Sequence, residues 1–431
     1  NTFKSVVGSS ITTIAGFAAL CFMTFRLGLN IGVVMMKGVA IGVVCCVTLL
    51  PAMVLLFDKA IEKTRHKPLI PSLDKISHFV TKHYKVWMAI FLALFIPALY
   101  GNNHNKVYYN IDKSLPDTLE SAVANEKLSN QFHLSNVYML LLENGIDAKD
   151  KQEMIEQVKE VDGVKWCIGM SSVVGSGVPE EMIPEELSKM LQGENYEVEF
   201  VASDFASATD EQNEQIRQVD RIVKGFNKNS MVIGEAPLMK DLSDVSSTDT
   251  RNVNIASIAA IFVIIMLVFK SVSLPFLLVL VIEFAIFVNM AIPCYAGTEL
   301  PFVASIVIGT VQLGSTVDYA ILMTSKYQRE RSRGAGKKEA IRRAHCSSMK
   351  SILVSGISFF AATFGVGLYS EIDMVSALCI LLSRGAVIST IVVICILPAM
   401  FMAFDKVICK TSIGFLPKEQ KAAGKEQAAQ S

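Results

Sequence analysis

Long apolar runs alternate with polar stretches along this chain of 431 residues. A helix needs roughly 20 predominantly apolar residues to cross a bilayer, and about eight segments approach or reach that length. The pattern therefore predicts an α-helical polytopic membrane protein. The predicted spans are Val6–Phe25, Gly38–Phe57, Val86–Tyr100, Asn254–Phe269, Leu274–Pro293, Val303–Met323, Ile352–Leu368 and Gly385–Phe404.

Basic residues are concentrated in two of the connections between these spans, 58–85 and 326–350, and in the tail. The short connections 295–300 and 369–373 contain no Lys or Arg and include Glu299, Glu371 and Asp373. Since Lys and Arg are retained on the cytoplasmic side, we expect the basic segments and both ends of the chain to lie in the cytoplasm. The expected location is the plasma membrane, with multiple passes.

The polar stretch 101–251 is then expected outside the cytoplasm as a folded domain. Its alternating and helical periodicities predict two successive β-α-β units, which suggest an α+β ferredoxin-like module. A further helix is expected at Pro184–Leu191, where Pro is followed by two acidic residues. The predicted elements are strands Asn136–Leu142, Val164–Ile168, Glu197–Ala202 and Met231–Gly234, with helices Ala148–Val161 and Asp210–Phe226.

Composition supports a membrane protein and gives no sign of catalysis. Hydrophobic residues make up 52% and charged residues 19% of the chain, and the formal net charge is zero. Neither the cysteines nor the histidines have ligand spacing, and no phosphate-binding Gly loop occurs, so we expect no metal, no cofactor and no enzyme. The basic segment 327–350 fits contact with anionic lipid better than with nucleic acid.

Two carboxylates lie inside predicted spans. Asp318 lies in the apolar run 301–327, where a charge costs several kcal/mol, so ionisable residues at such depth usually face a bundle interior or a water path. We expect Asp318 to act in an ion or proton relay, with Tyr319 beside it; a purely structural hydrogen bond is the alternative. Glu283 is a second intramembrane carboxylate, for which structural packing and ion coupling are equally plausible.

The first two spans resemble the last two. Leu50-Pro51-Ala52-Met53 recurs as Leu397-Pro398-Ala399-Met400, and Lys37-Gly38 recurs as Arg384-Gly385. Long-range repeats of membrane helices are typical of transporters whose two halves rock about a central site. The repeat partner of the Asp318 helix is then expected upstream of Asn1, which predicts an N-terminally truncated chain.

The run Gly314-Ser315-Thr316-Val317-Asp318-Tyr319-Ala320 resembles the G-x-x-x-D-Y signature of MmpL-type transporters, members of the resistance-nodulation-division superfamily. Ser383-Arg384-Gly385-Ala386 and the Leu-Pro-Ala step resemble the last helix of that family. The family has twelve helices and two porter domains. The resemblance implies helices five to seven in 1–100, the second porter domain in 101–251, helices eight to twelve in 252–406 and a cytoplasmic tail in 407–431.

The resemblance also implies a mechanism. Asp318 would take up and release a proton, Tyr319 would hydrogen-bond an equivalent pair in the other half, and Gly314 and Ser315 would permit close helix approach and a hydrated path. The implied function is export of hydrophobic or amphiphilic substrates, lipids or drugs, driven by the proton-motive force. Alternatives are a non-transporting scaffold or sterol-sensing-like regulator, or an auxiliary subunit of protein translocation. Expected partners are membrane lipids and the substrate, with a homo-oligomer left open and no nucleic acid.

Arg384 precedes the last predicted span. If that span begins at Gly385, Arg384 lies at the outer interface, where snorkelling is a better explanation than a substrate counter-ion. The apolar segment Met374–Leu382 would then lie along the outer surface.

Overall fold

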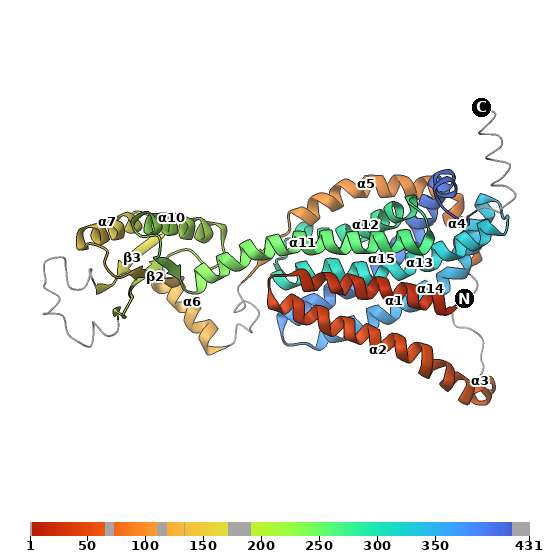
Figure 1. Ribbon diagram of the computed structural model, residues 1–431, viewed down its shortest axis with the longest axis horizontal. Coiled ribbons are helices and arrows are strands. Elements are labelled where there is room, and N and C mark those ends of the chain that lie inside the picture. Colours follow the sequence, from red (N-terminus) through yellow and green to blue (C-terminus); the bar gives the residue numbers. More distant parts are fainter. Residues whose placement is uncertain (1, 65–72, 110–118, 133, 171–190, 416–431) are drawn as a thin grey trace, which may run out of the picture. The chain divides into compact units, whose positions relative to one another are not determined.

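The computed structural model describes residues 2–64, 73–109, 119–132, 134–170 and 191–415. The chain divides into two compact units, each described here by itself (Figure 1). The helical unit consists of Asn1–Val107 and Thr248–Ser431, and the sheet unit consists of Tyr108–Ser247.

The helical unit contains the long apolar helices. Within the described part of the chain, seven helices are long and apolar enough to cross a membrane, namely α2, α5 and α11 to α15, and a shorter apolar stretch, Ser10–Phe22, runs from α1 into η1. The expected polytopic membrane fold is confirmed. The elements are α1 (Thr2–Ala19), η1 (Leu20–Phe22), α2 (Arg26–Leu56), α3 (Asp58–Lys63), α4 (Asp74–Lys82), α5 (Tyr84–Asn103), β1 (Val107–Tyr108), α11 (Glu235–Phe269), α12 (Ser273–Ala296), β6 (Leu300–Pro301), α13 (Phe302–Ser332), α14 (Lys337–Tyr369) and α15 (Asp373–Thr411).

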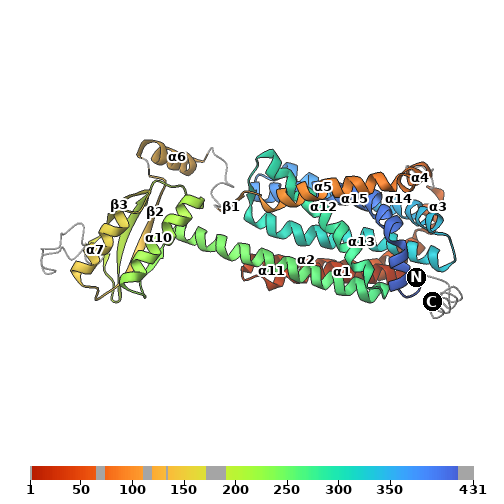
Figure 2. The ribbon, with the colours of Figure 1, turned by 90° about the horizontal axis from the view of Figure 1, so that it is seen from above.

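Helix α13 is the central element of the helical unit. It packs against α1, α12, α14 and α15 (Figure 2). Most of its residues are buried, including the polar residues Thr310, Gln312 and Thr316. By contrast, α2 exposes apolar residues along most of its length, as a lipid-facing helix does. The helix with the most polar residues in its apolar run is therefore the one most shielded from lipid.

The sheet unit has the split β-α-β topology. Its sheet has the order β3-β4-β2-β5, and neighbouring strands are antiparallel. Side chains of α7 and α10, among them Val219, form one core with strand residues such as Leu140 and Val201. This confirms the expected α+β ferredoxin-like module. Only Leu191 of the predicted helix Pro184–Leu191 falls within the described residues. The elements are α6 (Glu120–Phe132), β2 (Asn136–Glu143), α7 (Ala148–Lys159), β3 (Val164–Ile168), β4 (Tyr196–Ser203), α10 (Asp210–Phe226) and β5 (Met231–Ile233).

Five helices, α2, α11, α13, α14 and α15, extend well beyond the predicted apolar spans. Helix α15 is continuous from Asp373, so the prediction of a helix beginning at Gly385 with a separate surface segment is wrong, and Leu381 and Leu382 are buried within it. Helices α13 and α14 together occupy most of the predicted loop 326–350, leaving a short turn around Gly334. Lys, Arg and Glu are good helix formers, so a change from apolar to charged residues does not end a helix.

Two glycines of α2 offer a matched test of helix packing. A Cβ atom on Gly32 would lie 2.8 Å from the Phe17 carbonyl oxygen of α1, whereas one on Gly42 would meet no atom within 4 Å. We expect Gly32→Ala to lower the free energy of unfolding by about 1–3 kcal/mol. Gly42→Ala should raise it by up to about 1 kcal/mol, since Ala loses less backbone entropy in a helix. Thermal unfolding of the detergent-solubilised protein measures both, and equal effects would contradict this packing.

Candidate functional site

Asp318 of α13 faces two threonines of α1. The Thr12 hydroxyl donates to Asp318 Oδ1 at 3.5 Å, and the Thr13 hydroxyl lies beside the same carboxylate. Both threonines are buried, and Asp318 itself is half-buried. The described residues place no Lys, Arg or His within ion-pairing distance of Asp318, so its polar surroundings consist of hydroxyl groups.

Glycines bring α1 and α13 close together beside this carboxylate. A Cβ atom on Gly16 would lie 3.5 Å from the Cα atom of Gly314, and one on Gly314 would lie 3.7 Å from the Cα atom of Thr13. The Thr13 hydroxyl donates to the Gly314 carbonyl oxygen at 3.1 Å. Small residues permit such close approach of helix backbones in membranes. Gly314 thus lies in van der Waals contact with α1, one turn before Asp318.

Tyr319 faces a different helix. It is buried, with 5% of its surface exposed, and it hydrogen-bonds Ser355 of α14. Consecutive helical residues point about 100° apart. The Asp-Tyr pair therefore contacts α1 through Asp318 and α14 through Tyr319. Ser315 donates its hydroxyl to the Gln312 carbonyl oxygen of its own helix at 3.2 Å.

Glu283 lies apart from this group. It is half-buried on α12, on the same face as the exposed side chains of Phe276 and Leu280. Its carboxylate has no hydrogen-bond or ion-pair partner among the residues that the structure describes. The structure therefore does not bring the two predicted intramembrane carboxylates into one cluster.

A second polar group joins α12, α13 and α15, and the sequence did not reveal it. Asn289 donates to Gln312 Oε1 at 2.8 Å, and Gln312 in turn donates to the Ser389 hydroxyl at 3.0 Å. Arg384 donates to the side-chain oxygen of Asn289 at 2.8 Å and to its backbone oxygen at 2.9 Å. A Cβ atom on Gly385 would come within 2.7 Å of Gln312 Oε1, so glycine leaves the space that this cluster occupies.

This arrangement overturns the prediction that Arg384 snorkels at the outer interface. The guanidinium is bound to a neighbouring helix, and the described residues offer it no carboxylate. Its cost of burial is instead offset by charge-assisted hydrogen bonds to Asn289. In the sequence, the adjacent pair Arg384-Gly385 was a signal of this contact. Its role could not be predicted without knowing that Arg384 binds Asn289, which lies 95 positions away.

At the far ends of α13 and α15, an acid is paired with a base. Arg331 Nε lies 3.2 Å from Asp405 Oδ1, and the Tyr327 hydroxyl donates to the same carboxylate. The Tyr327 ring stacks on Phe401 with ring centres 4.8 Å apart. Asp405 therefore differs from Asp318, because it is ion-paired with a cationic side chain.

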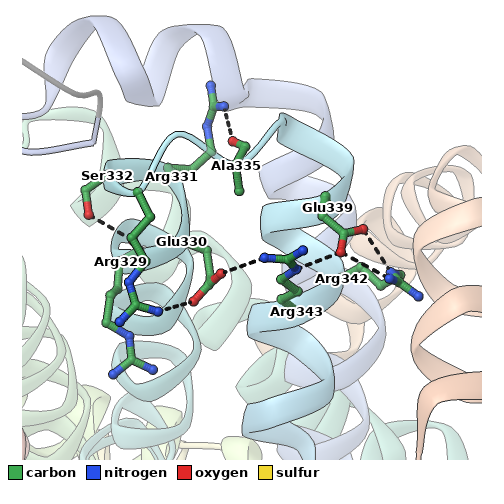
Figure 3. A network of polar contacts seen from close by, with 9 residues as sticks. Arg329, Glu330, Arg331, Ser332, Ala335, Glu339, Arg342 and Arg343 are labelled. Atoms are coloured by element: carbon green, nitrogen blue, oxygen red, sulfur yellow. Dashed lines mark hydrogen bonds and ion pairs between the residues drawn. The ribbon is translucent and has the colours of Figure 1, made fainter. Parts of the chain in front are cut away.

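The turn between α13 and α14 carries the network shown in Figure 3. Glu330 bridges Arg333 at 3.1 Å and Arg343 at 3.7 Å, and Arg343 continues to Glu339 at 2.7 Å. Arg331 donates to the Ala335 carbonyl oxygen at 2.9 Å, which closes the turn. Surface pairs of this kind contribute little each, so the network orients the two helix ends rather than supplying much stability. Among the described residues, no group of three or more His, Cys, Asp or Glu could hold a metal ion.

The Asn289 cluster gives a direct stability prediction. Asn289→Leu removes the side-chain acceptor of the half-buried Arg384 guanidinium, which keeps only the backbone oxygen of residue 289, and it removes the donor to Gln312 Oε1, so we expect unfolding to become easier by about 2 kcal/mol. Adding Arg384→Met removes the poorly paired charge and should recover at least half of the loss. Thermal unfolding in detergent is the measurement. A single variant as stable as the parent, or a double variant no better than the single, would contradict the assigned contacts.

Comparisons with known proteins place the chain in a family. The sequence profile of the MMPL family matches residues 1–87 and 113–419. The putative membrane protein YdgH of Bacillus subtilis is 20% identical over 287 residues, 65% of this chain and 31% of that protein. The acyltrehalose exporter MmpL10 of Mycobacterium tuberculosis is 25% identical over 165 residues, 36% of this chain and 16% of that protein.

A putative membrane protein of Streptomyces coelicolor is 30% identical over 146 residues, 32% of this chain and 20% of that relative. These alignments thus span less than a third of each relative's own length. The family match extends over most of the chain and includes the Asp318 helix and the Arg384 helix. With its apolar helices and split β-α-β sheet unit, this multi-pass membrane protein belongs to the MMPL family.

Proposed function

We propose that the chain forms part of an exporter of hydrophobic or amphiphilic molecules in the plasma membrane, driven by the proton-motive force. The observation that carries the proposal is the environment of Asp318: a carboxylate on the most buried membrane helix, bonded to a hydroxyl group of α1 and without a described cation. Intramembrane carboxylates of this kind mark proton relays. Asp405, by contrast, is ion-paired with Arg331.

Proton exchange at Asp318 would change the contact between α1 and α13. An ionised carboxylate accepts a stronger hydrogen bond from the Thr12 hydroxyl than a neutral carboxyl group does. Because the two helices meet at Gly16 and Gly314, a change in this bonding acts where their backbones are close. Because α1 and α13 are in close contact, we expect α1 to move when Asp318 gains or loses a proton.

Two observations support the proposed substrate class: the name of one relative and the membrane location of this chain. One relative is named as an exporter of acyltrehaloses, which carry acyl chains. We assign this chain a lipid or another apolar or amphiphilic substrate, with the sheet unit outside the cytoplasm and the basic segments 58–85 and 326–350 inside. The Asp-Tyr pair supplies the energy coupling, and the sheet unit handles the substrate.

The test replaces Asp318 by asparagine in the natural protein. Asp318→Asn keeps the size and one oxygen but removes proton exchange, so we expect export of a fluorescent acyl lipid to fall at least about tenfold at equal membrane level, equivalent to about 1.4 kcal/mol. Glu283→Gln, measured in parallel, should retain export within about twofold, because Glu283 lies apart from the α1–α13 contact.

Export that survives Asp318→Asn would overturn the relay. A protein that never moves the lipid, yet loses binding to another protein when its sheet unit is altered, would be a scaffold or regulator. A secretion defect without altered lipid handling would instead identify an auxiliary subunit of protein translocation.

A further inference from the structure

Residues 20–25 form an elbow that joins α1 to α2, and a carboxylate from another helix binds it. Asp249 of α11 accepts hydrogen bonds from the backbone N–H groups of Thr24 at 2.9 Å and of Phe25 at 3.1 Å. Both bonds end on the same oxygen, Oδ2, and Asp249 is 1% exposed. A buried carboxylate that accepts two backbone N–H groups is a strong, directional contact.

These bonds act at the start of α2. The helix begins at Arg26, and its N-cap residue, Phe25, has no side chain that could accept a hydrogen bond. The first N–H groups of a helix have no partner within it, and the helix dipole favours a negative charge there. Asp249 accepts the N–H groups of the N-cap residue Phe25 and of Thr24 before it, and so places a carboxyl group at this helix end, although it lies more than 220 positions away in sequence.

The two helices that the elbow joins, α1 and α2, pack closely against each other. Gly28 leaves room for the Met23 side chain, and Gly32 leaves room for the Phe17 carbonyl oxygen, so α1 and α2 pack tightly as a hairpin. Met23 and Phe17 are both buried. Because close-packed helices move together rather than deforming, a displacement of α1 carries the elbow with it.

Each side of the elbow leads to a different part of the molecule. Toward the membrane interior, α1 carries Thr12, which bonds Asp318, and Thr13, which lies beside the same carboxylate. On the other side, α11 is one continuous helix, Glu235–Phe269, whose first residues belong to the sheet unit and whose later residues belong to the helical unit. Its buried residues Val253, Ser257, Ile261 and Ile265 recur every fourth position, which is the spacing of one packed helix face.

We infer that Asp249 is a positioning residue that couples α1 to α11, so that movement started at Asp318 reaches the helix continuous with the sheet unit. The inference rests on the proposed function and adds the mechanical link between proton exchange at Asp318 and the sheet unit. The route runs from Asp318 to the threonines of α1, through the elbow, and across the Asp249 hydrogen bonds into α11. Without these bonds, proton exchange continues while its movement no longer reaches the sheet unit.

The test measures proton flux and export separately. The natural protein is reconstituted in liposomes, proton entry is followed with an enclosed pH-sensitive dye under an imposed pH gradient, and export is followed with a fluorescent acyl lipid. For Asp249→Ala we expect export to fall at least about tenfold while proton flux stays within about threefold of the parent. A misfolded variant would lose both, so the two readouts separate uncoupling from damage.

Two further variants sharpen the result. Asp249→Asn retains an oxygen that can accept both backbone bonds and should restore export to within about threefold of the parent. Asp241→Ala on the same helix removes an exposed carboxylate that lies 3.4 Å from Lys240 Nζ and should leave both readouts unchanged. Export that is equally low for Asp249→Asn would overturn the hydrogen-bonded link.

The two proposals can fail independently. If Asp318→Asn leaves proton flux intact, the proposed function fails. If Asp318→Asn abolishes flux but Asp249→Ala lowers flux and export in parallel, or lowers neither, then only the coupling role of Asp249 fails.

Discussion

The arrangement of the helical unit depends on one constraint: polar groups inside an apolar bundle must find partners on neighbouring helices. Asp318 meets this constraint through the hydroxyl groups of Thr12 and Thr13, which reach it because Gly16 and Gly314 let two backbones approach closely. In our proposal, the position of α1 against α13 is thereby linked to the protonation of this one carboxylate.

The same constraint gives the other polar groups different roles. Arg384 is bonded by Asn289, and Asp405 is paired with Arg331, so each of these charges is fixed in a structural contact. Asp318 has hydroxyl partners that tolerate either protonation state, since a hydroxyl group can donate or accept. Asp249 caps a helix across the bundle. Of these groups, Asp318 is therefore best suited to exchange a proton, and the others hold the neighbouring helices in place.

Much of this architecture was predictable, because apolar length and alternating periodicity are local signals. The helix Asp210–Phe226 and the strand Val164–Ile168 have the predicted bounds, and Asp318 stands out by its surroundings alone. What sequence could not supply is the pairing of distant residues. The roles of Arg384 and Asp249 depend on which helices pack together, and helix ends such as Asp373 are decided by tertiary packing rather than by the apolar boundary.

The central claim is that Asp318 exchanges a proton and that α1 responds. Infrared difference spectroscopy of the reconstituted natural protein across a pH titration tests it most directly. The account predicts a carboxyl C=O band that follows pH, disappears in Asp318→Asn and shifts when the Thr12 and Thr13 hydroxyl groups are removed together. A pH-dependent carboxyl band that persists in Asp318→Asn, or the absence of such a band in the parent, would contradict it.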